Sequence, residues 1–519
     1  MKNSIILLLA ALAFTTFSCD DFLDVKPIGK LIPSKVAEFE NLLNNSVTID
    51  RFMMDNNRYC FYAMMGDNLE VSSHIFDNEF VSTMVNMELL SATIFYDPVL
   101  DPKVTYMGWS YGVYQPVGIF NNVIKGVSDI DANSQYAKEV IAQAKVGRAW
   151  IYLNHALTYG PMYDPSGAND KPTVPLRTTE DPTVANGPLA TTAQIFAQVI
   201  EDLNYACENC PLIVANPCRA DRAAAYALRA EYYMYMRDWS NMLKDSEEAW
   251  RLALANRGSV DQLIYKLAEF KYVATTPVEA PDGCSEEYYM KLTGPDLDFE
   301  QTTNRENLLY RITPWGSVTS RFYPSEDWRN QFDKENDLRW KLFALTIPGY
   351  KKTISGQVYD DGPRLCFIKD EVFSTSQGLT YPLLLLMKAE AKARTSDLSG
   401  ALSDLNLLRK YRYSGESTDL PNGSSLSEDQ LLEEILKERR KEQPLVSYQR
   451  TLDLKRYVLD NGKPWSKQTI THKVGNKVYS KPMTDRYFQS LPIDNAILEF
   501  NPQWGIELDF RSYEPYNAK

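Results

Sequence analysis

The sequence predicts a mainly α-helical protein made of helical hairpins and long irregular loop insertions. Three observations carry this prediction. Apolar residues recur at helical spacing through two stretches, about 111–255 and 380–457. Within each stretch, small residues on one helix precede bulky residues on the next, across a short turn. The segment between them, about 258–380, is rich in Gly, Pro, Asp and aromatic residues and has no sustained helical period.

The N-terminus has the three parts of a secretory signal. Lys2 supplies the positive charge, Ile5–Phe14 is apolar, and small and polar residues lead to Cys19. The apolar run is too short to cross a bilayer, which needs ~20 residues. We expect residues 1–18 to be removed and Cys19 to carry a lipid anchor. An ordinary secreted protein is the alternative, because Thr16 stands where a lipobox usually has Leu.

The composition of the remaining chain limits the class of protein and the partners it can have. With 44% hydrophobic residues, the mature chain can bury a large core, and we expect residues 19–519 to form a single unit because no linker is visible. The net charge is -13 and no stripe of Lys or Arg is present, so a nucleic-acid partner is excluded.

The first clear helices come early. A helical pattern begins at Tyr111, and a stronger one covers Ala137–Tyr159, where Gly160-Pro161 ends it. In that second helix a narrow face of small and β-branched residues predicts close packing against another helix: Val140, Ala144, Gly147 and Ile151.

The most readable hairpin covers Thr191–Ala255. Thr191 and Gln194 have the spacing of a capping box. The next helix carries alanines on one face, and its partner opposes them with bulky side chains, among them Trp250. Tyr381–Lys410 repeats this scheme, which is how a tetratricopeptide-type hairpin packs. The spacing of the hairpins is irregular, so a regular solenoid is not predicted.

A charged helix, Ser427–Tyr457, follows, interrupted at Pro444. Its run Glu438–Glu442, with Asp453 and Arg456, allows two interpretations. One is a basic site for an acidic ligand. The favoured one is an exposed helix whose opposite charges lie three or four residues apart.

Motifs for catalysis are weak. Gly108–Gly112 has the G-x-S-x-G spacing of a hydrolase nucleophile elbow, but a turn precedes it where that motif needs a buried strand. Cys207 and Cys210 form a C-x-x-C at the end of a helix, where the dipole disfavours a thiolate. Redox chemistry and a zinc site are therefore disfavoured, and a bridge involving these cysteines or Cys218 is an open alternative. We expect no enzyme, no metal and no cofactor.

Several segments together resemble the SusD-like (RagB/SusD) family of outer-membrane nutrient-binding lipoproteins. They begin with the run from Cys19 to Pro27 and continue through the helices described above. Leu491-Pro492-Ile493 and Asn501-Pro502 complete the set near the C-terminus. The chain departs from the family pattern at Val446–Arg450, before Asp453-Leu454-Lys455-Arg456.

The resemblance implies a lipid-anchored cell-surface protein of the outer membrane that binds oligosaccharides or polysaccharides. Its implied partner is a SusC-like TonB-dependent transporter, to which it would deliver the glycan. A peptide-binding member of the same family is the main alternative, and a secreted glycoside hydrolase is a weaker one.

Ligand residues of this family lie in variable loops, so candidates must come from residue chemistry. Sugars present an apolar face flanked by hydroxyls, which suits exposed rings beside carboxylate, amide or guanidinium groups on loops. Trp315 is the preferred platform because Pro314 and Gly316 predict a turn tip. The full predicted set is Trp315, Tyr96, Trp328, Tyr323, Arg305, Asp67 and Asn68, with Asn304 beside Arg305.

Overall fold

The computed structural model of the chain describes residues 33–50, 61–81, 87–97, 109–295, 303–311, 322–373 and 376–510. Long helices dominate, as predicted. They are α9 (Gln115–Ile130), α10 (Gln135–Tyr159), α11 (Thr192–Asn209), α12 (Arg222–Met236), α13 (Trp239–Arg257), α18 (Tyr381–Arg394), α19 (Leu398–Arg412), α20 (Glu428–Glu442) and α21 (Tyr448–Tyr457).

Short helices lie at both ends of the chain and in the insertion. They are α3 (Val36–Leu42), α4 (Val47–Asp50), α5 (Phe61–Met64), α6 (Ser73–Ile75), α7 (Met87–Ile94), α15 (Glu326–Arg329), α16 (Leu338–Phe343), α17 (Lys369–Phe373), α22 (Arg486–Gln489) and α23 (Asn495–Glu499). Two π-helical turns, η2 (Phe76–Val81) and η4 (Ser110–Tyr114), and several short 3-10 turns complete the helical part.

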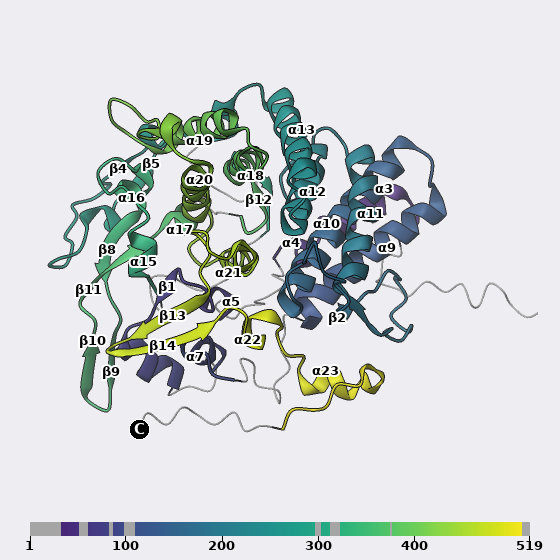
Figure 1. Cartoon of the computed structure of the whole chain (residues 1–519), viewed down its shortest axis with the longest axis horizontal. Helices are drawn as coiled ribbons and strands as arrows, with labels where there is room; N and C mark the ends of the chain where they lie inside the picture. Colours follow the sequence, from purple (N-terminus) through teal and green to yellow (C-terminus); the bar gives the residue numbers. More distant parts are fainter. Residues whose placement is uncertain are drawn as a thin grey trace, which may run out of the picture.

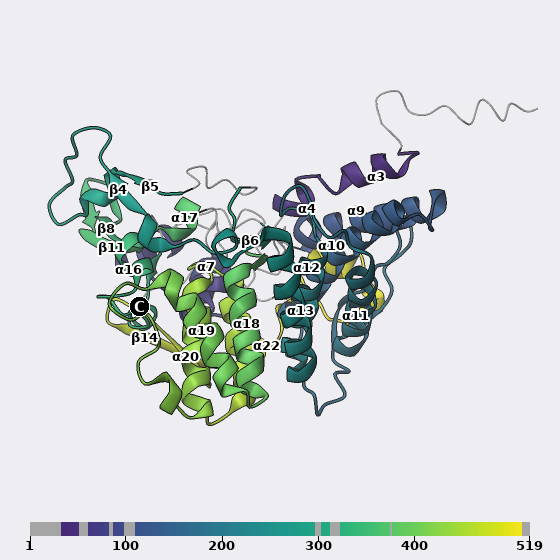
Figure 2. The ribbon, with the colours of Figure 1, turned by 90° about the horizontal axis from the view of Figure 1, so that it is seen from above.

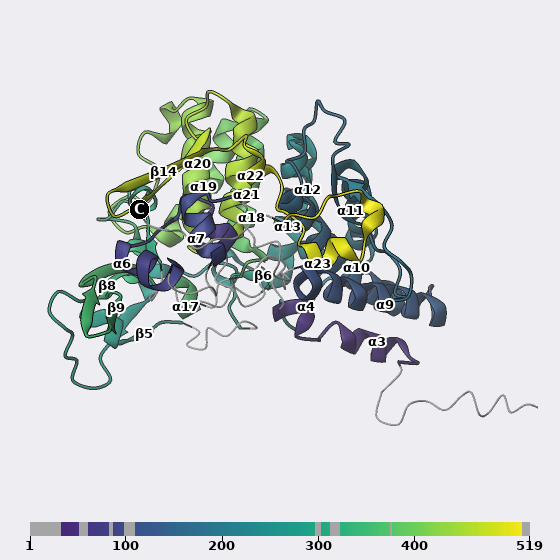
Figure 3. The same ribbon diagram turned by 90° about the horizontal axis from the view of Figure 1, so that it is seen from below.

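The helices form one continuous arrangement (Figure 1). α9 to α13 lie at one end of the molecule, α18 to α21 at its centre, and the insertion at the other end (Figure 1 and Figure 2). Figure 3 shows the C-terminal segment with α22 and α23 running across the underside toward α10.

Close packing depends on the small residues that the sequence singled out. Gly147 on α10 faces the ring of Phe120 on α9, and a Cβ at Gly147 would lie 2.2 Å from that ring. Ala223, Ala227 and Ala230 on α12 are fully buried. Both predictions are confirmed, because only small side chains let the helix backbones approach this closely.

The two hairpins share one turn design. Arg237 between α12 and α13 and Ser396 between α18 and α19 both have left-handed backbones, with φ of 61° and 68°. In each case the next residue, Asp238 or Asp397, caps the following helix by accepting a backbone N–H. The predicted capping box at Thr191 is also present.

The insertion is more regular than predicted. It holds short antiparallel strand pairs: β4 (Lys271–Val273) with β5 (Lys291–Thr293), β6 (Asn307–Leu309) with β12 (Leu379–Thr380), β8 (Ala344–Pro348) with β11 (Pro363–Phe367), and β9 (Lys351–Ile354) with β10 (Gln357–Asp360). β7 (Tyr323–Pro324) pairs outside the insertion with β1 (Leu69–Glu70), and β2 (Pro172–Pro175) pairs with β3 (Leu189–Thr191). Near the C-terminus β13 (Thr469–Val474) and β14 (Lys477–Pro482) form a hairpin.

The favoured prediction for the charged helix is wrong. Glu438–Glu442, Asp453 and Arg456 are all buried. Burial is possible because the charges neutralise one another: Arg456 binds Glu390 at 2.7 Å and Asp453 at 2.7 Å, and Arg339 from the insertion binds Glu438 and Glu442. α20 therefore joins the insertion to the helical core instead of facing solvent.

Candidate functional site

The structure separates the predicted ligand residues. Cys19 and Trp315 lie outside the described residues. Trp328 is fully buried and packs against Phe332 and Phe367, with ring centroids 4.6 and 4.7 Å away. Its prediction as an exposed platform is wrong, because the ring completes the aromatic core beneath α15.

Tyr323 is also an internal residue, with 4% of its surface exposed. Its hydroxyl donates to Asp361 at 2.9 Å and accepts the N–H of Tyr350 at 2.9 Å. Burial raises the pKa of this phenol, so the group stays protonated and ties β7 to Tyr350 and Asp361 within the insertion. Tyr96 is half-buried just after α7.

Arg305 and Asn304 lie in a different region from the other candidates. The Arg305 guanidinium stacks over Tyr265, 4.7 Å from the ring centre, and donates to the carbonyl of Asp261. Asn304 is buried and donates to the carbonyl of Phe373. Both contacts stabilise the insertion.

Asp67 and Asn68 occupy the centre of a pocket wall. Two nitrogens of Arg450 donate to the Asp67 carboxylate at 2.7 and 2.9 Å, and Lys467 donates at 2.5 Å. Arg440 lies 3.2 Å from the same carboxylate and donates to the side-chain carbonyl of Asn68. These cations hold the pKa of Asp67 well below its usual range despite its burial.

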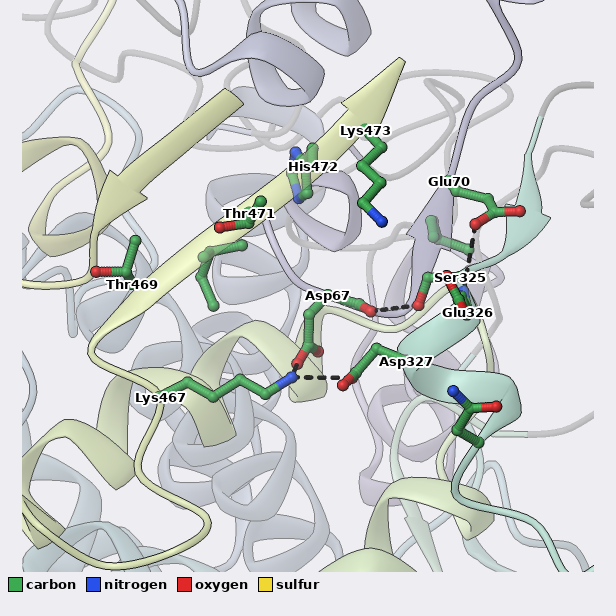
Figure 4. A pocket seen from close by; sticks show the side chains of 13 residues that line it. Asp67, Glu70, Ser325, Glu326, Asp327, Lys467, Thr469, Thr471, His472 and Lys473 are labelled. Carbon is green, nitrogen blue, oxygen red and sulfur yellow. Dashed lines mark hydrogen bonds and ion pairs between the residues drawn. The ribbon is translucent and has the colours of Figure 1, made fainter. Parts of the chain in front are cut away.

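The pocket beside Asp67 has a volume of 560 Å³, which is within the range of ligand sites. Figure 4 shows its walls: β1 on one side, the first turn of α15 below, and β13 opposite. Hydroxyl, carboxylate and ammonium groups dominate its lining: Asp67, Leu69, Glu70, Ser325, Glu326, Asp327, Asn330, Lys467, Thr469, Ile470, Thr471, His472 and Lys473.

Helix capping fixes the lower wall. Ser325 begins α15, accepts the N–H of Trp328 and donates its hydroxyl to the carbonyl of Asp67 at 2.6 Å. Asp327 on that turn receives Arg440 at 2.6 Å and Lys467 at 2.9 Å. One end of the pocket is thus closed by Lys467, which bridges two carboxylates (Figure 4).

A second cavity of 340 Å³ adjoins the first, since Glu70 and Lys473 line both. Burial raises the pKa of Glu70, and Arg329, 3.4 Å away, only partly opposes this. The second cavity is also lined by His74, whose ring nitrogen lies 3.0 Å from the carboxylate of Asp361. Glu70 and Lys473 therefore divide a polar groove into two parts.

The floor of the pocket is made by His472. Its ring is buried, stacks on Phe95 with centroids 4.5 Å apart, and faces the carbonyls of Gly66 at 2.6 Å and Thr93 at 2.9 Å. Burial lowers the pKa of His472, while both carbonyls favour protonation. The residue ties β13 to the segments before β1 and within α7.

Sequence reasoning missed Glu70, Lys467, Lys473 and the threonines of β13. The signal was present: alternating polar and apolar residues over 469–474, followed by Gly475-Asn476, are typical of a strand entering a hairpin turn. No hairpin was predicted for this segment, so its contribution to a pocket was not foreseen.

The weaker motifs do not form a catalytic site within the described residues. His155, the first histidine after Gly108–Gly112, is buried among the rings of Trp109 and Tyr159, and burial lowers its pKa to about 3. Cys207 and Cys210 are free thiols whose pKa values burial raises. No cluster of His, Cys, Asp and Glu suited to a metal occurs in the part of the chain that the structure describes.

Residues 21–234 match a family described as "Starch-binding associating with outer membrane", of the SusD-like group, and residues 383–515 match the SusD family. The chain belongs to the SusD family. None of the curated proteins matches it.

Solved structures of SusD proteins share the fold. A SusD superfamily protein from Bacteroides thetaiotaomicron is 16% identical, with a TM-score of 0.61 over 90% of this chain and 98% of its own. One from Bacteroides fragilis is 18% identical, with a TM-score of 0.61 over 91% and 99%. A SusD-like carbohydrate binding protein from Bacteroides vulgatus is 17% identical, with a TM-score of 0.54 over 91% and 97%. At these identities the likeness shows the fold of a SusD protein.

Proposed function

We propose that this SusD protein is a lipid-anchored binding protein of the outer-membrane surface that captures oligosaccharides for a SusC-like TonB-dependent transporter. The observation that carries the proposal is the polar pocket between β1, α15 and β13. Its hydroxyl, carboxylate and ammonium groups come from rigid elements and suit a ligand rich in hydroxyls. The description of the matching family and the name of the Bacteroides vulgatus relative support a carbohydrate ligand.

Glu70 and Lys473 are the principal contacts of this proposal. Lys473 is exposed and its ammonium points into the pocket toward Glu70 (Figure 4). Adjacent hydroxyls of a sugar can donate to a carboxylate and accept from an ammonium, so this pair can hold both. Because such bonds involve charged groups, each contributes more than a bond between neutral groups.

Binding is tested with the purified soluble chain on a glycan array and then by calorimetry. Lys473→Ala should weaken binding of a selected glycan by about ten-fold, which corresponds to ~1.4 kcal/mol. Lys477→Ala on the same hairpin is the matched control, because Lys477 is exposed but does not line the pocket. Equal affinities for both variants would place the ligand elsewhere.

The membrane part of the proposal rests on Cys19 and the signal before it. In the described part of the chain, no helix is long and apolar enough to cross a membrane. Cys19→Ala should move the protein from the membrane fraction to the soluble fraction. A variant that stays with the membrane would refute the lipid anchor.

The transporter part is tested by co-purification from outer membranes in mild detergent, at native expression. Recovery with a TonB-dependent transporter supports it, and recovery only as a monomer opposes it. A peptide ligand remains the alternative within the family, and an array that retains peptides and no glycan would favour it. A turnover assay on candidate glycans separates binding from hydrolysis.

Trp315, Tyr96 and Arg305 remain predictions for a wider ligand surface. Trp315→Ala is expected to leave folding intact and to lower the affinity for a neutral oligosaccharide. Measuring the glycan affinity of Trp315→Ala and of Lys473→Ala by calorimetry would show whether the ligand extends beyond the pocket.

A further inference from the structure

The pocket is a gap between the inner edges of two strands. β13 uses its outer edge to pair with β14, and β1 uses its outer edge to pair with β7. A single parallel bridge between Val71 and Val474 joins the inner edges at one end. Lys467 and Asp67 join them at the other end, 2.5 Å apart. Three residues lie between these ties on the β1 side and six on the β13 side, so the strands part between them.

Backbone groups of β13 therefore border the cavity. Five consecutive residues, Thr469–Lys473, line the pocket, although side chains along a strand alternate between its two faces. This places the strand edge against the cavity. In an antiparallel pair, alternate residues direct their N–H and C=O away from the partner strand. Among the described residues, apart from the bridge at Val474, no hydrogen bond from outside the hairpin reaches the backbone of residues 469–473.

A small apolar patch lies beside this open edge. Leu69 on β1 and Ile470 on β13 both line the otherwise polar pocket. They are 4% and 1% exposed, so only a narrow apolar surface is offered. The pocket thus combines an open strand edge, a narrow apolar patch, and the polar pair Glu70 and Lys473.

We propose that the pocket recognises the acetamido group of an N-acetylhexosamine in a neutral oligosaccharide, an inference that rests on the proposed carbohydrate-binding function. An acetamido group carries one N–H and one C=O, as a peptide unit does, and pairs with a free strand edge in the way an added strand would. Its methyl group contacts Leu69 and Ile470. The ring hydroxyls then reach Glu70 and Lys473.

Charge explains why the ligand is neutral. Glu70, Glu326 and Asp327 would repel the carboxylate of an acidic sugar. The Lys467 ammonium is already held by Asp67 and Asp327, whereas Lys473 forms no ion pair within the described part of the chain. A free amino sugar lacks both the carbonyl and the methyl group, so it would leave the strand edge and the apolar patch unused.

Three β-1,4-linked trimers that differ only at C2 test this inference by calorimetry: those of N-acetylglucosamine, glucosamine and glucose. The acetylated trimer should bind about ten-fold or more tightly than either other trimer, because a site built to pair with a polar group rejects analogues that lack it. Equal binding of the glucose trimer would overturn the inference and leave the proposed function standing. If none of the trimers binds and the glycan array shows no ligand, both the inference and the proposed function are overturned.

Two variants place the recognition in this pocket. Leu69→Ala removes the methyl contact and should reduce the preference for the acetylated trimer several-fold. Glu70→Gln should weaken all three trimers alike and keep the preference. An unchanged preference in a folded Leu69→Ala protein, or binding of an N-acetylated peptide without any saccharide, would contradict the assignment. The wild-type series needs no variant, so it tests the inference even if Leu69→Ala fails to fold.

Discussion

Replacing Asp67 by Asn tests the electrostatic support of the pocket. The substitution keeps the size of the side chain and removes its charge. Arg440 and Arg450 are both buried and both depend on this carboxylate, at 3.2 and 2.7 Å. The pKa of Arg440 is already lowered by burial and by the neighbouring Arg450, so loss of Asp67 leaves two cations close together with less compensation.

The size of the effect follows from that geometry. Removing one partner of a buried ion pair costs ~3 to 5 kcal/mol, because the other charge stays buried without compensation. We expect Asp67→Asn to lower the free energy of unfolding by an amount in this range at pH 7. The exposed pair Lys125 and Asp129 gives the matched control, since both side chains are more than half exposed. Asp129→Asn should change the free energy of unfolding by less than ~0.5 kcal/mol.

The assay is urea unfolding followed by circular dichroism, between pH 8 and pH 3. Because the folded pKa of Asp67 is lowered, its contribution is fully present above the unfolded value of 3.8 and is lost as the pH falls toward the folded value. The difference between wild type and Asp67→Asn should therefore stay constant from pH 8 to about 5 and shrink below about 4. A difference under ~1 kcal/mol at pH 7, similar to the Asp129 control, would refute the reasoning.

Three further results are expected. Trp250→Ala should lower the free energy of unfolding by ~3 to 5 kcal/mol in urea titrations, because this α13 ring is 6% exposed and lies against Lys388 of α18; an unchanged midpoint would contradict its core position. Thr191→Ala should cost ~1 kcal/mol in the same titrations, through loss of the α11 capping box, and a neutral result would count against that cap. Because burial lowers the pKa of His155 to about 3 from 6.5, the unfolded state binds a proton more readily, and stability should fall by about 2 kcal/mol between pH 7 and 5. His155→Phe should abolish that share of the pH dependence, and an unaltered profile would show that His155 does not titrate in this way.

The helical scaffold was predictable because its signals are local. The capping box at Thr191, the alanine face of α12 and the close approach at Gly147 depend on residues a few positions apart, and the structure uses each as expected. Helical periodicity and capping both depend on residues that are close together in the sequence.

The charged helix could not be assigned in the same way. Opposite charges spaced three or four residues apart look the same whether they face solvent or one another across a core. The partner that buries Glu438 and Glu442 is Arg339, about a hundred residues away on the insertion. Such long-range pairing has no local signal.

The candidate site shows the same limit. Asp67 was predicted for its polarity, but its role is set by Arg440, Arg450 and Lys467, nearly four hundred residues later. Trp328 was predicted as a ligand platform from composition, whereas its burial is decided by Phe332 and Phe367. An aromatic ring in a loop-rich segment gives no sign of which way it points.

The most direct test of the central claim is a crystal structure of the protein with a glycan selected on the array. The account predicts sugar density in the groove between β1 and β13, with hydroxyls within hydrogen-bond distance of Glu70 and Lys473. Sugar bound outside that groove, with both side chains as they are in the unbound protein, would contradict it.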